Sequence, residues 1–171
     1  MKLLLFLFLT VSLPALAQDF PKNFVGHWEG TLEWHQAGNP VPRKVRMQLV
    51  IQPADTLGQY TWQIIYGAGG EDNRPYLLKP VDTAKGHWVV DERNGILLDQ
   101  FWVGQRFTSV FSVQNSTILD SYYIENGKLV AEFYSYTAKP LQRSGKGTDE
   151  SPFVDSFATK AYQRAVMERK K

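Results

Sequence analysis

The chain has 171 residues, and its 19 Lys and Arg against 17 Asp and Glu give a formal net charge of only +2. This balance excludes the concentrated positive charge that is typical of dedicated nucleic-acid-binding proteins. The sequence holds no cysteine, so neither disulfides nor lipid attachment through cysteine is available, and a folded domain must draw its stability from an apolar core.

Residues 1–17 have the three parts of a secretory signal. Lys2 supplies the basic start, residues 3–11 form an apolar run, and Ala-Leu-Ala at 15–17 is a small-x-small cleavage site. The apolar run is shorter than the roughly 20 residues that a membrane helix needs. We therefore expect export to the periplasm or the extracellular space, no membrane span after cleavage, and one domain over residues 18–171. An uncleaved N-terminal anchor is the alternative.

Beyond the leader, apolar and polar residues alternate with a period of two, which predicts half-buried β-strands. In the first segment Trp28, Leu32 and Trp34 share one face, opposite His27 and Glu29. The predicted strands are, in chain order, 27–34, 44–52, 59–66, 74–80, 86–91, 96–103, 106–113, 117–125, 128–137 and 154–166.

The segments between these strands carry turn chemistry. Asn94-Gly95 and Asn126-Gly127 supply the positive φ angles that tight hairpins require. Residues 143–152 are polar and lack periodicity, which predicts a mobile loop, and residues 162–171 are expected to end in a short turn.

About ten short strands with short connections predict antiparallel neighbours. Such a chain either closes on itself or leaves exposed strand edges. We therefore expect an all-β fold, a single antiparallel up-and-down β-barrel of about ten strands, whose interior holds side chains and one small ligand. A two-sheet sandwich is the alternative.

Residues 26–30 read Gly-His-Trp-Glu-Gly. A Gly-x-Trp at the start of an all-β chain resembles the calycin superfamily, which includes the lipocalins and the fatty-acid-binding proteins. The resemblance implies a lipocalin-like barrel in which Gly26 and Trp28 plug one end and a basic residue of the last strand, Arg164, stacks over the tryptophan. A guanidinium on an indole face contributes about 0.5–2 kcal/mol.

The same opening is similar to that of the nitrobindins, small barrels that hold haem through a histidine late in the chain. Here no histidine follows His87, so we expect no haem and no other cofactor. A catalytic zinc needs about three converging ligands, whereas His27, His35 and His87 are expected at the solvated surface. We expect no metal site. No nucleophile motif occurs either, so no catalytic residue is predicted.

Aromatic side chains in the middle strands predict the wall of a ligand cavity, because such pockets combine aromatic linings with a few polar groups. The predicted ligand-binding residues are Trp62, Tyr66, Tyr76, Trp88, Arg106, Phe107, Phe111, Tyr122 and Phe133. We expect them to bind a small, largely apolar molecule, with about 25 cal/mol gained per Å² of apolar area buried.

Charged residues interrupt the same strands at Asp99, Arg106, Asp120 and Glu132. An unpaired charge inside a barrel is costly, so each either lies outside in an ion pair or meets a polar ligand group inside. If they converge inside, the alternative function is an enzyme acting on a carbonyl, sugar or ester. A third alternative is a solidly packed barrel that serves as a protein-interaction module.

Overall fold

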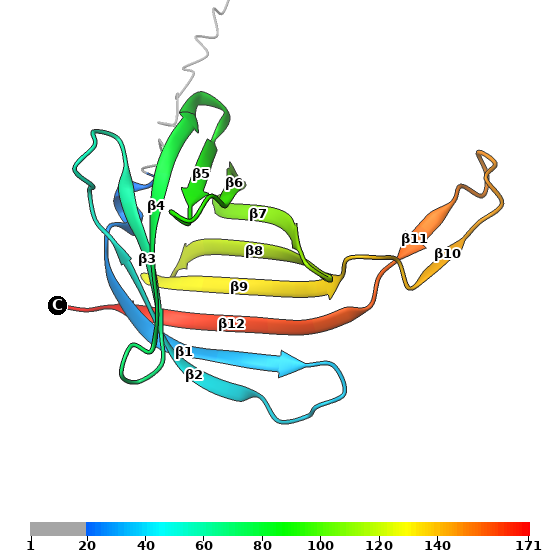
Figure 1. Cartoon of the computed structure of the whole chain (residues 1–171), viewed down its shortest axis with the longest axis horizontal. Helices are drawn as coiled ribbons and strands as arrows, with labels where there is room; N and C mark the ends of the chain where they lie inside the picture. The colour runs from blue at the N-terminus through cyan, green and yellow to red at the C-terminus, as the bar shows by residue number, and fades with distance from the viewer. Residues whose placement is uncertain (1–19) are drawn as a thin grey trace, which may run out of the picture.

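The protein is an antiparallel up-and-down β-barrel, shown in Figure 1 from a computed structural model that describes residues 20–171. Ten strands close the barrel in the spatial order β1-β12-β9-β8-β7-β6-β5-β4-β3-β2, and β2 pairs with β1 again. Their bounds are β1 Gly26–Gln36, β2 Arg43–Ile51, β3 Tyr60–Tyr66, β4 Asp72–Asp82, β5 His87–Asp91, β6 Leu97–Val103, β7 Arg106–Val113, β8 Ser116–Glu125, β9 Lys128–Thr137 and β12 Thr159–Arg169.

This architecture confirms the predicted fold class and excludes the sandwich, because the first and last strands pair with each other, residues 28–36 against residues 161–169, and so close the sheet. The predicted signal segment 1–17 lies outside the described residues. Within the described part of the chain, no helix has the length and apolar character needed to cross a membrane. The only helical turns there are the short 3-10 segments η1 (Lys22–Phe24) and η2 (Thr83–Lys85).

Each strand has one face toward the barrel interior and one toward solvent, which explains why the alternation of apolar and polar residues predicted the strands correctly. Apolar side chains at every second position point inward and form one core, whereas their neighbours face solvent. At the hairpin between β8 and β9, Asn126 and Gly127 adopt φ angles of 51° and 75°, as a tight turn of Asn-Gly type requires.

The contact between β1 and β12 depends on Gly30. A Cβ atom at this position would lie 2.2 Å from the carbonyl oxygen of Val166. Only a residue without a side chain lets these two strands approach so closely.

Two local predictions need correction. The loop expected at 143–152 lies at 145–153, at the tip of a two-stranded arm that the sequence did not predict, made of β10 (Gln142–Ser144) and β11 (Val154–Ser156). The expected terminal turn at 162–171 is instead the continuation of β12, because pairing with β1 and β9 keeps this segment extended.

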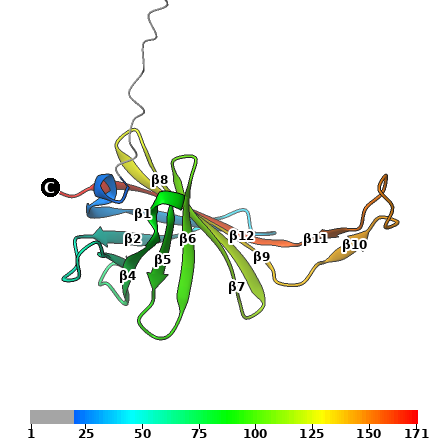
Figure 2. The ribbon, with the colours of Figure 1, turned by 90° about the horizontal axis from the view of Figure 1, so that it is seen from above.

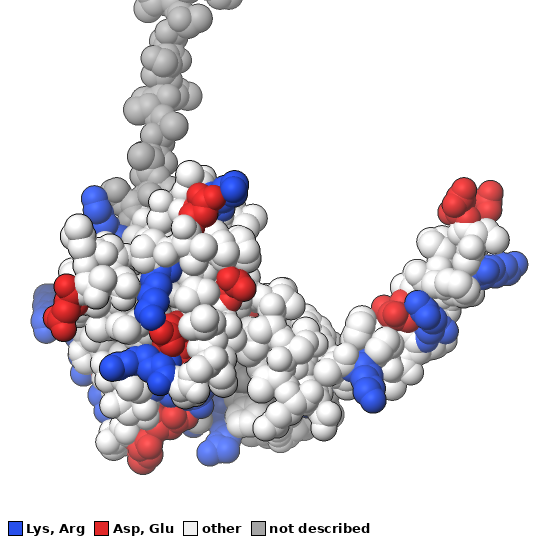
Figure 3. All heavy atoms as spheres, turned by 45° about the horizontal axis from the view of Figure 1, so that its top comes forward, with Lys and Arg blue, Asp and Glu red and all other residues white. Residues whose placement is uncertain are grey.

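The arm projects away from the barrel, as Figures 1 and 2 both show. The single strand predicted at 154–166 is divided in the structure: its first residues form β11 of the arm, and the remainder belongs to β12 of the barrel. Apolar side chains on the arm are exposed, among them Leu141 and Phe153. On the face of the molecule drawn in Figure 3, basic and acidic residues are interspersed over both barrel and arm.

Candidate ligand-binding cavity

One end of the barrel is closed by Trp28. Its indole Nε1 donates a hydrogen bond of 2.7 Å to the carbonyl oxygen of Phe24. The guanidinium carbon of Arg169 lies 4.5 Å from the centre of the Trp28 ring, and the same guanidinium donates to the carbonyl oxygen of Asn23 at 2.9 Å. An arginine of the last strand does stack over Trp28, as predicted. The predicted residue was wrong, because the stacked side chain is that of Arg169 and not that of Arg164.

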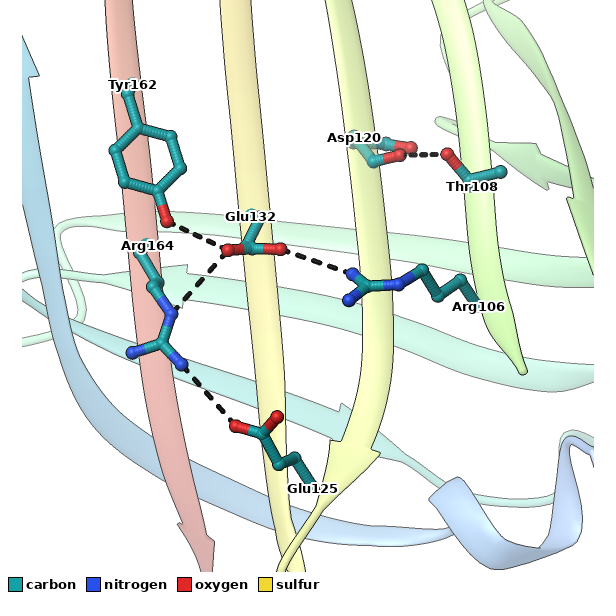
Figure 4. Close-up of polar contacts among 7 residues, drawn as sticks. All are labelled: Arg106, Thr108, Asp120, Glu125, Glu132, Tyr162 and Arg164. Carbon is teal, nitrogen blue, oxygen red and sulfur yellow. Dashed lines mark hydrogen bonds and ion pairs between the residues drawn. The ribbon is translucent and has the colours of Figure 1, made fainter. Parts of the chain in front are cut away.

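Arg164 lies on the outer face of the barrel, because the inward positions of β12 are those of Ala165 and Met167. Figure 4 shows its contacts: its Nε lies 3.6 Å from a carboxylate oxygen of Glu132, and its Nη2 lies 3.7 Å from Glu125. It therefore belongs to a surface network and has no part in the plug.

The predicted cavity residue Arg106 belongs to the same outer network. Its guanidinium donates to Glu132 at 3.3 Å and lies 3.8 Å from the centre of the Tyr123 ring. Tyr162 donates to the other oxygen of Glu132 at 2.8 Å. Placing Arg106 among the ligand-binding residues was wrong, because its neighbour Phe107 takes the inward position on β7.

The opposite end of the barrel is open and contains a cavity of about 380 Å³. Six of the nine predicted ligand-binding residues line it: Trp62, Tyr66, Tyr76, Phe111, Tyr122 and Phe133. Three of these rings meet edge to face, with centroids 5.1 Å apart for Trp62 and Tyr122 and 5.8 Å apart for Tyr122 and Phe133. Their placement around one hollow agrees with the sequence, and their role in binding stays a prediction.

Phe107 and Trp88 point into the barrel but lie deeper, in the packed half. Phe107 is fully buried, and its ring lies 4.4 Å from that of Phe20, centre to centre. Trp88 meets the same Phe20 ring at 5.4 Å. Both residues therefore belong to the core that closes the barrel and not to the cavity wall.

A polar group crosses three adjacent strands at the wall of this cavity. Asp120 on β8 accepts hydrogen bonds from the backbone N–H and the hydroxyl of Ser109 on β7, at 2.9 and 2.8 Å. Its second oxygen accepts a 3.2 Å hydrogen bond from the Nε2 of Gln100 on β6. Both Asp120 and Gln100 line the cavity and are buried. Burial raises the pKa of Asp120, although the three donors oppose this shift.

The mouth of the cavity carries an ion pair. Arg74 donates from Nε to Oδ1 of Asp72 at 3.0 Å and from Nη2 to Oδ2 at 2.6 Å, and its guanidinium also lies 5.0 Å from the centre of the Tyr66 ring. Burial raises the pKa of Tyr66 to about 12, against the lowering effect of Arg74. The Tyr66 phenol is therefore neutral at physiological pH and remains able to donate a hydrogen bond.

The other two predicted acids do not reach the interior. Asp99 contacts His87 on the outer face at 2.7 Å, and Glu132 belongs to the surface network. Asp120 is thus alone in the cavity among the four charged residues considered for catalysis. Among residues 20–171 no cluster of three or more metal-ligating side chains occurs.

No protein-family model matches the sequence, and no curated protein matches it either. The cavity itself is thus the basis for a functional argument.

Sequence reasoning missed Gln100, Arg74, Asp72 and Trp34 as cavity residues. A signal for Gln100 was present, because it has the same parity as the inward Leu98 and Trp102 on its strand. No such signal identified its partnership with Asp120, which depends on the register of β6, β7 and β8.

Proposed function

We propose that this protein is an exported, lipocalin-like binding protein that holds one small, largely apolar molecule in the open half of its barrel. The observation that carries the proposal is the cavity of about 380 Å³ lined by aromatic and aliphatic side chains together with several polar ones, open at one end and closed by a packed core at the other. Its volume falls within the range of about 300–1,000 Å³ that is usual for small-molecule sites.

The composition of the wall supports this function. Aromatic and aliphatic side chains such as Trp62, Ile64 and Phe133 supply apolar surface, and the polar group at Asp120 offers a means to orient the ligand. A barrel that served only as a packed interaction module would have no need for this hollow. An enzyme that used paired carboxylates from Asp99, Asp120 and Glu132 is not supported, since only Asp120 faces inward.

Titration with prodan tests the binding. Prodan is a naphthalene dye whose emission changes in an apolar environment, and it has no hydrogen-bond donor. We expect saturable binding to the wild type, and loss of at least about tenfold in affinity in Ile118→Trp, because Ile118 lines the cavity and an indole there would fill it.

The matched control is Leu119→Trp, the next residue on the same strand. Leu119 is absent from the cavity wall, and its side chain points to the other face. This variant should bind prodan as the wild type does. Equal binding by both variants, or no saturable binding by the wild type, would contradict the proposed function.

Export is tested separately by the intact mass of the protein recovered from its native host. Cleavage after Ala17 predicts a chain that begins at Gln18. A mass that includes the leader contradicts this part of the proposal.

A further inference from the structure

The wall of the barrel is only partly paired between β6 and β7. These two strands pair beside their hairpin alone, through residues 101–103 of β6 and 106–108 of β7. Farther from the hairpin, residues 97–100 pair only with β5 and residues 109–113 only with β8. In Figure 1 the two strands run in different directions beyond the hairpin. Residues 109–113 therefore form a strand edge that has no neighbour in the part of the chain that the structure describes.

The backbone of this edge directs hydrogen-bonding groups to its open side. Val113 faces β8, because it closes the two-residue turn to Ser116 and the two residues form a hydrogen-bonded pair. The direction of the backbone groups alternates along a strand. Val110 and Ser112 thus direct their N–H and C=O groups toward the side where no strand lies.

The side chains along the edge do not protect it from other chains. Natural sheets keep exposed edges from further pairing by means of charged side chains, proline or bulges. Residues 109–113 contain neither a charge nor a proline, and their register with β8 is regular. The outward side chain of Val110 is 65% exposed. Such an edge is suited to accept an extended strand from another chain.

The arm is a second β-structure without a partner. Within residues 20–171, its three-residue strands β10 and β11 pair only with each other. An isolated two-stranded ribbon is marginally stable in water. This ribbon nevertheless exposes four large apolar side chains by 47–75%, those of Leu141, Phe153, Val154 and Phe157. Its own barrel does not cover them, because the arm projects away from it.

We infer that the arm of one copy of this chain docks on the open edge of β7 in a second copy, where it adds a strand to the sheet and covers Val110. The base of the arm lies at the end of this edge, since the N–H of Ala138 donates at 3.3 Å to the carbonyl oxygen of Asn115 in the β7–β8 turn. A two-fold axis beside this turn brings each arm to the edge of the other copy, and the exchange closes as a dimer.

The exposed apolar surface matches what a stable dimer needs. Besides the four side chains of the arm, four more are exposed on the edge and on the facing part of β6, namely Ile96, Leu97, Val110 and Val113. At roughly 150–200 Å² for a fully exposed side chain of this size, the exposed parts of all eight amount to roughly 700–900 Å² per protomer, close to the roughly 800 Å² that each partner contributes to a stable interface.

Sedimentation equilibrium over a series of concentrations tests the association. We expect a dimer of the wild type with a dissociation constant of about 1–100 μM. Val110→Lys places a charge on the edge and should weaken the association at least about tenfold. Val81→Lys is the matched control, because Val81 is 57% exposed on β4, three strands away, and it should associate as the wild type does. A wild type that stays monomeric at about 500 μM, or equal weakening by both variants, overturns the inference.

Cross-linking tests which surfaces meet. The chain has no cysteine, so Ser112→Cys on the edge and Ser156→Cys on the arm each introduce a single thiol. When the two variants are mixed and oxidised, with one of them labelled with ¹⁵N, mass spectrometry should find mainly the mixed disulfide dimer. Ser156→Cys mixed with Thr56→Cys, which lies in an exposed loop, should give no such excess. A product in which Ser156→Cys pairs mainly with itself means that the arms meet each other, and overturns the inference.

The dimer and the binding function are tested independently. Val110 is absent from the cavity wall, so Val110→Lys should still bind prodan. Replacement of the arm by a short turn should also give a monomer at every concentration. If Val110→Lys does not fold, as judged by circular dichroism, the arm replacement and the cross-linking still decide.

Discussion

The guanidinium group of Arg169 covers the indole of Trp28 at 4.5 Å, so that the end of the last barrel strand is held against the start of the first. The indole is almost fully buried beneath it and donates to the backbone just before β1. This one contact joins the two segments whose pairing closes the barrel, at the end where the interior is packed.

Trp28→Ala is expected to lower the free energy of unfolding by about 3–5 kcal/mol, as truncation of a large core side chain does. Urea denaturation measures the change. Trp34→Ala is the matched control, because Trp34 lies on the same face of the same strand but at the cavity mouth and is only partly buried. A smaller loss is expected there. A Trp28→Ala loss below about 1 kcal/mol would mean that the indole does not close the barrel.

Gly30→Ala should lower the free energy of unfolding by about 1–3 kcal/mol, which is the usual loss when an extra methyl group is forced into a packed site. The new methyl group would lie 2.2 Å from a backbone oxygen of Val166, and this oxygen cannot move without disturbing the β1–β12 pairing. Gly69→Ala is the control, since its nearest neighbour is the end of the flexible Glu71 side chain at 3.4 Å. Similar unfolding free energies for the two variants would contradict the close approach.

The strands and their inner faces could be predicted because a barrel wall has one apolar and one solvated face, which imposes a period of two. The same alternation along the last strand also indicates which arginine covers Trp28. Arg169 shares its face with Ala165 and Met167, whereas Arg164 does not. The family resemblance drew attention to an arginine on the last strand without specifying which one.

Other parts of the site depend on contacts between strands and were not readable from a single segment. The hydrogen bond between Gln100 and Asp120 depends on how β6, β7 and β8 are aligned with one another. The arm was missed because Gly145 and its polar neighbours show no alternation, although β10 and β11 pair on either side of them.

Asp120→Asn should change how stability depends on pH. Burial raises the pKa of Asp120 above its ordinary value of 3.8. As pH rises, the unfolded chain therefore loses this proton first, and between the two pKa values the folded state binds more protons. The contribution of Asp120 to stability is thus greatest in acid and declines as pH rises through this window.

In the Asp120→Asn variant this dependence disappears. The new amide is able to donate to Gln100 once that side chain turns over. We expect the unfolding free energy of the variant relative to the wild type to increase between about pH 4 and pH 7. A difference that stays constant or shrinks would contradict the raised pKa.

Removal of the arm should leave the barrel intact. Leu141 and Ser156 are joined by a 2.7 Å backbone hydrogen bond at its base, so residues 141–156 can be replaced by an Asn-Gly turn that keeps the two chain ends close. We expect the midpoint of thermal unfolding to change by no more than about 4 °C, and prodan binding to persist. A large fall in the midpoint would show that the arm supports the barrel.

The pairing of β1 with β12 also governs when the molecule can finish folding. Almost the entire described chain separates these partners, so β1 has one unpaired edge until the C-terminal strand has been synthesised and brought back to it. Contacts so distant in sequence form slowly, and an open edge during that interval is a site for pairing with other chains. Loss of even the last few residues would prolong this exposure, because Arg169 and Met167 are among those that complete the seam.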